Sequence, residues 1–175
     1  MATLTLLGTA DAVLLEQGAL TVAPQPVDEA APVAKKSGPD IPALLQELNF
    51  DARLQRESNL LEQVTPVGLA IDYRTLFDDG RFASIAWIDG AQAKRSFTDL
   101  KQKLLQTFSP QLQELVDETT QDPEGPVVNR LSFIDPAISP DRFIFLRVRE
   151  RLYEIHVTPG REERLTGLLQ ALATR

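Results

Sequence analysis

The sequence contains no cysteine and a single histidine, His156. Without cysteine there is no disulfide framework, no thiolate nucleophile and no cysteine-ligated zinc, and such a chain suits a reducing compartment. One histidine also leaves most ligands of a zinc site to be supplied by carboxylates, which is uncommon for this metal. We therefore expect a cytoplasmic protein with no metal ion and no other cofactor.

Two groups of functional motifs are missing as well. The 9 glycines are scattered and form neither a GxxxxGK[ST] loop nor a GxGxxG loop, so no phosphate cradle is indicated. No serine lies in a GxSxG segment, and one histidine would have to activate any serine nucleophile. The sequence has no recognisable catalytic constellation, and we interpret the protein as non-catalytic.

Long apolar runs are also absent. No uncharged apolar segment approaches the roughly eighteen residues that a membrane-spanning helix requires. A secretory signal begins with basic residues, whereas residues 2–20 carry only the acidic charges of Asp11 and Glu16. We expect neither export nor membrane insertion.

Acidic residues outnumber basic ones by 25 to 18, which gives a net charge of -7. The isoelectric point near 4.8 disfavours nucleic-acid binding, because the chain repels phosphate backbones. Arginines gather in the stretch 142–164, but glutamates are interleaved with them. We interpret this stretch as a mixed, solvated surface, with an anion or nucleic-acid contact through the late arginines as an alternative.

The chain divides into an arm, a linker and a domain. Residues 1–23 consist of two short apolar runs punctuated by glycine, which predict a β arm or hairpin. Residues 24–40 are rich in proline and alanine and predict a flexible linker. Residues 41–175 are sufficient for a single domain. The partner-binding candidates in the arm are Leu4, Leu6, Leu7, Val13, Leu14, Leu15, Leu20 and Val22.

Hydrophobic periodicity and turn signals predict the elements of the domain. The expected elements are helices at 41–48 and about 51–65, two strands joined by a turn at 78–81, a helix from Ser96, another after Ser109-Pro110, strands at 127–134, 142–149 and 152–158, and a final helix after Thr158. Short connections favour antiparallel pairing. We predict an α+β fold, a mainly antiparallel sheet with helices packed on it, plus the N-terminal β arm.

The strand expected at 152–158 places Glu154 and His156 on one face, because side chains alternate along a strand. A carboxylate and an imidazole side by side can act as an acid/base pair or hold a ligand. The alternative, which we favour, is a partly exposed structural histidine. Arg147 and Arg149 share one face of the preceding strand. These four residues form a possible ligand or anion site that contains no metal.

Four aspartates, Asp72, Asp78, Asp79 and Asp89, surround the first hairpin. Aspartate is common in turns because its side chain bonds to nearby backbone groups. The spacing lacks the alternating acidic positions of an EF-hand loop. We favour turn chemistry over a divalent-cation site.

The tethered apolar arm carries the leading functional hypothesis. We expect a non-catalytic interaction or structural assembly subunit, in which the arm adds a strand to an edge of a neighbouring subunit, identical or different, to form an oligomer. The arm folding back onto its own domain is the simpler alternative. A second hypothesis is a small-ligand-binding or enzymatic domain that uses Glu154 and His156 in a cleft. The third is anion or nucleic-acid contact through the late arginines.

Overall fold

The structure is a computed structural model that describes residues 38–107, 111–121 and 123–174. The chain divides into two units, Met1–Val33 and Ala34–Arg175, and every described residue belongs to the second. The arm expected at 1–23, with its candidate partner-binding residues, and most of the linker expected at 24–40 lie outside the described residues. Strand addition by the arm therefore stays a prediction.

A seven-stranded antiparallel sheet forms the centre of the second unit, with the strand order β1-β2-β3-β7-β6-β5-β4. The strands are β1 (Asp51–Arg53), β2 (Asp72–Phe77), β3 (Arg81–Asp89), β4 (Gln113–Gln121), β5 (Val127–Asp135), β6 (Ser139–Val148) and β7 (Arg151–Val157). The predicted α+β fold is confirmed.

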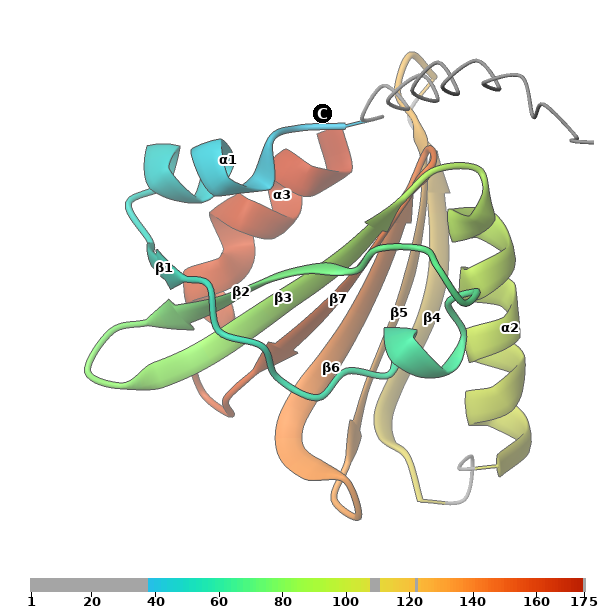
Figure 1. The fold of residues 1–175 in the computed structure, drawn as a ribbon. Helices are drawn as coiled ribbons and strands as arrows, with labels where there is room; N and C mark the ends of the chain where they lie inside the picture. The colour runs from blue at the N-terminus through green and yellow to red at the C-terminus, as the bar shows by residue number, and fades with distance from the viewer. Residues whose placement is uncertain (1–37, 108–110, 122, 175) are drawn as a thin grey trace, which may run out of the picture. The chain divides into compact units, whose positions relative to one another are not determined.

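Helices cover both faces of this sheet (Figure 1). One face packs against α1 (Ile41–Glu47), the 3₁₀ helix η2 (Glu162–Leu165) and α3 (Thr166–Thr174), and its core includes Trp87 and Tyr153. The other face packs against α2 (Gln92–Thr107) and the 3₁₀ helix η1 (Leu61–Gln63). None of the helices in the described part of the chain is both long enough and apolar enough to cross a membrane.

Several of the predicted elements are present. The Asp40 side chain accepts a hydrogen bond from Ala43 N and caps α1. β3 lies between β2 and β7, and its side chains from Phe82 to Ile88 are buried, as expected for a strand that is apolar on both faces. The strands expected at 127–134, 142–149 and 152–158 correspond to β5, β6 and β7.

The helix expected at about 51–65 is wrong. This segment forms β1 and then η1, and Leu54 between them is 71% exposed. β1 pairs with β2 from Asp51 opposite Phe77 to Arg53 opposite Thr75. The hydrogen bonds that β1 forms with the edge of β2 outweigh the helical propensity that the spacing of apolar residues suggests.

The helix expected after Ser109-Pro110 is also wrong, because residues 113–121 form β4. β4 completes the hydrogen bonding of β5, from Val116 opposite Ser132 to Gln121 opposite Val127. β-Branched residues in its second half favour the extended backbone. α2 is present but begins at Gln92, before the expected start. The final helix is divided into η2 and α3.

Candidate functional site

A cavity of about 270 Å³ lies where the 57–60 segment crosses the sheet between the starts of β3 and β6 and the end of β7. Its lining combines charged, aromatic and aliphatic side chains. The lining residues are Glu57, Ser58, Asn59, Leu60, Arg81, Ile138, Ser139, Asp141, Phe143 and His156. A volume near 300 Å³ is at the lower end of the range for small-molecule sites.

Glu154 and His156 lie side by side on β7, as their strand positions predict. His156 Nε2 lies 2.6 Å from Glu154 Oε1. The Glu154 side chain is fully buried, and its two oxygens accept hydrogen bonds from Leu60 N at 2.8 Å and Leu61 N at 2.7 Å. Glu154 thus fixes the start of η1 over the sheet and also orients the imidazole ring.

His156 is only 8% exposed, so the expectation of a partly exposed histidine is wrong. The 57–60 segment covers this face of β7, and the sequence had suggested a helix there. The His156 ring also contacts Phe143 edge-on, with ring centroids 4.5 Å apart. The ring lines the cavity while one of its nitrogens is held by a buried carboxylate.

Glu57, Arg81 and Asp141 form an ion-paired group on the same cavity. Arg81 Nε donates to Glu57 Oε1 at 2.8 Å, and Arg81 Nη1 donates to Asp141 Oδ2 at 2.9 Å. Burial acts to raise the pKa of Glu57, but hydrogen bonding to Arg81, Ser84 and Thr75, with the charge of Arg81, outweighs it and lowers the pKa. Glu57 is therefore ionised at neutral pH.

Asp141 is 7% exposed, and its backbone N–H donates to Ser139 Oγ at 3.1 Å. Two carboxylates share one guanidinium in this group, which leaves an excess of one negative charge. Phe143, Leu60 and Ile138 give the same cavity an apolar wall. Charge complementarity favours a ligand with a positive group and an aliphatic part.

The structure places the other two candidate residues elsewhere. Phe143 lies opposite His156, whereas Arg147 lies opposite Leu152. Arg147 lies four positions from Phe143 along β6, which is about 13 Å at the usual strand rise. Arg147 and Arg149 line a different hollow beside the β4–β5 turn. The four-residue site suggested by the sequence is therefore two separate pairs.

The solvated arginine surface expected at 142–164 holds only in part. Arg161 and Arg164 pair with Asp78, and Arg142 pairs with Glu114. Arg151, however, is 2% exposed. It could not be distinguished from its exposed neighbours because its acidic partner is 62 residues away in the sequence.

The aspartates around the first hairpin do not converge. Asp78 N donates to Gly80 O at 2.8 Å in the β2–β3 turn, and the Asp78 side chain pairs with arginines. Asp89 pairs with Arg151. Within the described ranges, no three histidine, aspartate or glutamate side chains are arranged to hold a metal ion.

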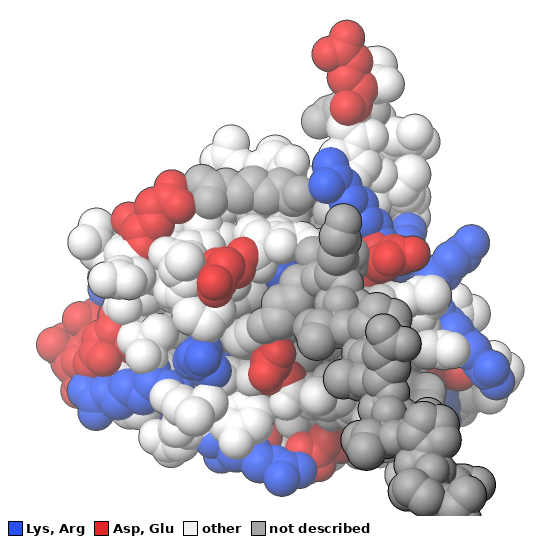
Figure 2. Space-filling view, turned by 45° about the horizontal axis from the view of Figure 1, so that its top comes forward, with Lys and Arg blue, Asp and Glu red and all other residues white. Residues whose placement is uncertain are grey.

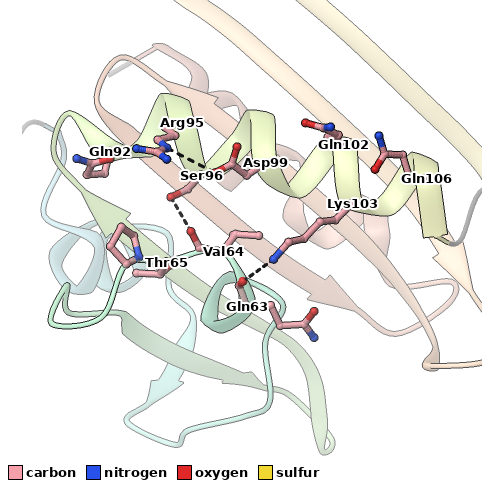
Figure 3. A pocket seen from close by; sticks show the side chains of 11 residues that line it. Gln63, Val64, Thr65, Gln92, Arg95, Ser96, Asp99, Gln102, Lys103 and Gln106 are labelled. Atoms are coloured by element: carbon pink, nitrogen blue, oxygen red, sulfur yellow. Dashed lines mark hydrogen bonds and ion pairs between the residues drawn. The ribbon is translucent and has the colours of Figure 1, made fainter.

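A second hollow of about 590 Å³ lies between α2 and residues 63–66 (Figure 3). Its wall on α2 is polar, and its two sides are already bonded to each other. Lys103 Nζ donates to Gln63 O at 2.9 Å, and Ser96 Oγ donates to Val64 O at 3.2 Å. These contacts hold α2 against the loop, so we interpret the hollow as part of the packing between the two elements and not as a ligand site.

Glu57, Arg81 and Asp141 were not identified from the sequence. Glu57 lies in the segment for which the sequence predicts a helix, and that helix does not form. Arg81 is a charged residue at the start of a largely buried strand. This position is the one local feature in the sequence that could have marked Arg81 as a site residue. Asp141 lies 60 residues from Arg81, so no spacing rule connects them.

Comparisons with known proteins do not identify the chain. No family model matches it, and no curated protein matches it. Among solved structures it is similar to a GTP-binding regulator from Thermotoga maritima, with a TM-score of 0.43 and 11% sequence identity, over 70% of this chain and 78% of that chain. At this distance the likeness carries no argument about function.

Proposed function

We propose that the described unit is a ligand-binding domain whose cavity beside Arg81 holds a small organic ammonium ion with an aliphatic stem. The observation that carries this proposal is the placement of two carboxylates and one guanidinium against an apolar wall in a single cavity. The two carboxylates accept hydrogen bonds from the ammonium group. The stem packs on the apolar wall.

Each part of the cavity has a separate task. Arg81 holds the Glu57 and Asp141 carboxylates in fixed positions, so little side-chain entropy is lost when the ligand binds. Phe143 and Ile138 contact the stem and exclude water from the ion pair, which strengthens it. The buried Glu154 fixes the His156 ring and the 57–60 segment, so the cavity is formed before the ligand arrives.

The first prediction concerns binding of n-butylammonium, measured by titration calorimetry. Asp141→Asn should raise the dissociation constant by at least about tenfold, because a hydrogen bond to a charged group is worth about 1.5–3 kcal/mol. Asp99→Asn removes the same charge from an ion pair on α2, outside the cavity, and should change the constant by less than about threefold.

Two results would contradict this proposal. One is the absence of saturable binding to the wild-type chain. The other is an equal effect of Asp141→Asn and Asp99→Asn, which would indicate a general charge effect. Far-UV circular dichroism of each variant separates loss of binding from loss of the fold.

Assembly through the N-terminal arm is a second candidate function, supported by the exposed edge of the sheet. Among the described residues, β4 is an edge strand of nine exposed residues that pairs with β5 alone. An open edge of this length can accept an added strand. A bulge between Gln113 and Val116 leaves the second half of β4 as the regular part of this edge.

The second prediction tests the arm. A chain that starts at Asp40 should be monomeric by light scattering, whereas the full chain should be an oligomer. The full-length variant Leu4→Asp/Leu6→Asp should behave like the truncated chain. Each aspartate would place a charge where the added strand buries an apolar side chain, and burying an unpaired charge is costly. The assembly proposal is wrong if the full chain is monomeric and binds no protein partner, or if the truncated chain keeps the same oligomeric state and partner binding.

A further inference from the structure

A third cavity, of about 470 Å³, lies between α2 and the strands β5 and β6. The lining residues on α2 recur every three or four positions, so they lie on one side of the helix. The lining residues are Lys94, Phe97, Thr98, Lys101, Gln102, Leu105, Asn129 and Arg147. Basic side chains border the cavity, and Phe97, which is buried, and Leu105, which is half-buried, form its apolar part.

Arg147 is held in position by neutral groups. Its Nε donates to Asn129 Oδ1 at 2.6 Å, and its Nη1 donates to Arg149 O at 3.0 Å. Asn129 Nδ2 in turn donates to Thr119 Oγ1 at 2.8 Å. Arg147, Asn129 and Thr119 lie opposite one another on three adjacent strands, so they form one row of hydrogen bonds across the sheet.

The guanidinium of Arg147 is therefore oriented without a carboxylate. Within residues 38–107, 111–121 and 123–174, its hydrogen bonds go only to an amide oxygen and a backbone carbonyl. A guanidinium has five N–H groups, and these two contacts leave most of them available. A fixed fork of donors matches the oxygens of a phosphate or carboxylate group.

The charge around this cavity is the reverse of the charge of the whole chain. Lys94, Lys101 and Arg147 supply three positive charges, and one acidic group, Asp117, pairs with Lys101 at 2.5 Å. The lining is therefore basic on a chain whose net charge is -7, and Glu124 borders the neighbouring hollow that Arg147 also lines. Figure 2 shows basic side chains below the projecting tip of the molecule, with acidic atoms on the tip itself and a further acidic group among the basic side chains.

We propose that this cavity binds a small phosphate monoester that carries an apolar group. The phosphate group, with about -1.5 to -2 charges at neutral pH, is attracted by the three basic side chains of the lining. Arg147 binds two phosphate oxygens, and the flexible lysines of α2 contribute point charges. The apolar group lies on Phe97 and Leu105. The volume of about 470 Å³ is within the usual range for small-ligand sites.

The third prediction tests this site with phenyl phosphate as the probe, by titration calorimetry on the full chain. Arg147→Gln should raise the dissociation constant by at least about tenfold, because it removes charge-assisted hydrogen bonds. Arg95→Gln removes the same charge from the same helix but from a side chain that lines the other hollow. It should change the constant by less than about threefold.

Further arms of the experiment define the ligand. Inorganic phosphate should bind more weakly than phenyl phosphate, because it makes no contact with Phe97 and Leu105, and phenol should not bind. Asp141→Asn should leave phenyl phosphate binding intact, which separates this site from the ammonium cavity. Circular dichroism checks that Arg147→Gln folds, and Arg147→Lys should recover part of the affinity.

The proposal is wrong if phenyl phosphate shows no saturable binding to the wild-type chain. Equal effects of Arg147→Gln and Arg95→Gln would also overturn it, because they would indicate attraction by the general surface charge. If inorganic phosphate binds as tightly as phenyl phosphate, the apolar part of the proposal fails.

Discussion

Replacing Arg151 by alanine is expected to lower the free energy of unfolding by about 3 kcal/mol, the lower end of the usual cost of breaking a buried ion pair, because its partner Asp89 is 23% exposed. Arg151 is 2% exposed, and its Nη2 donates to Asp89 Oδ2 at 2.8 Å, while its Nη1 donates to Pro39 O. The side chain thus joins the start of β7 to the end of β3 and to the entrance of α1. Alanine leaves the Asp89 carboxylate without its partner and leaves a space.

The surroundings of Arg151 support a structural role. Burial acts to lower the pKa of Arg151, but hydrogen bonding to Asp89 and the influence of Tyr153 outweigh it and raise the pKa. Gly38 lies so close that an added Cβ would be 3.1 Å from the guanidinium. Gly38→Ala should therefore also destabilise the protein, although less than Arg151→Ala, because the neighbouring chain can adjust.

Urea unfolding measures this prediction, and Arg149→Ala provides the matched control. Arg149 lies two residues away and is exposed, so its removal takes the same charge from the same hairpin without opening the core. Arg151→Lys should keep the charge but lose the two-pronged contact with Asp89, and its stability should be intermediate. A loss for Arg151→Ala no larger than that for Arg149→Ala would show that the buried pair contributes nothing.

The sequence was sufficient for the elements whose signals are local. Asp40 caps α1, and the Asp79-Gly80 turn joins β2 to β3, because caps and tight turns depend on neighbouring residues. The alternation along β7 placed Glu154 and His156 on one face correctly. Each of these features needs information from only a few consecutive positions.

The errors arose where distant parts of the chain decide the structure. Residues 51–53 are extended because β1 pairs with β2, and η1 begins where Glu154 accepts the N–H groups of Leu60 and Leu61. That carboxylate lies more than 90 residues away in the sequence. β4 likewise forms because β5 offers it an open edge. The propensity of a short segment carries no information about such distant partners.

The candidate sites show the same limit. The sequence identified the His156–Glu154 pair, but it grouped this pair with Arg147 and Arg149, which the structure places at the other end of β6. Arg147 also lines a second cavity together with two lysines of α2. A group of charges from different elements becomes a site only when the packing of those elements is known.

Replacing Glu154 by alanine should lower the free energy of unfolding by about 2–6 kcal/mol, because two buried N–H groups lose their acceptors. The change leaves Leu60 N and Leu61 N without the acceptors that lie at 2.8 and 2.7 Å, and a buried donor without a partner costs about 1–3 kcal/mol. His156 loses its contact at 2.6 Å as well. The 57–60 segment should then separate from β7, and the cavity beside Arg81 should lose its shape.

Urea unfolding measures the stability of this variant, and hydrogen exchange at Leu60 and Leu61 reports the local opening. Glu118→Ala is the matched control, because Glu118 is a strand glutamate whose ion pair is exposed and therefore worth little. Glu154→Gln retains one acceptor oxygen and should fall between the wild type and Glu154→Ala. If the stability and exchange of Glu154→Ala match those of Glu118→Ala, Glu154 does not hold the segment. If Glu154→Ala loses stability but still binds n-butylammonium normally, the cavity does not depend on this carboxylate.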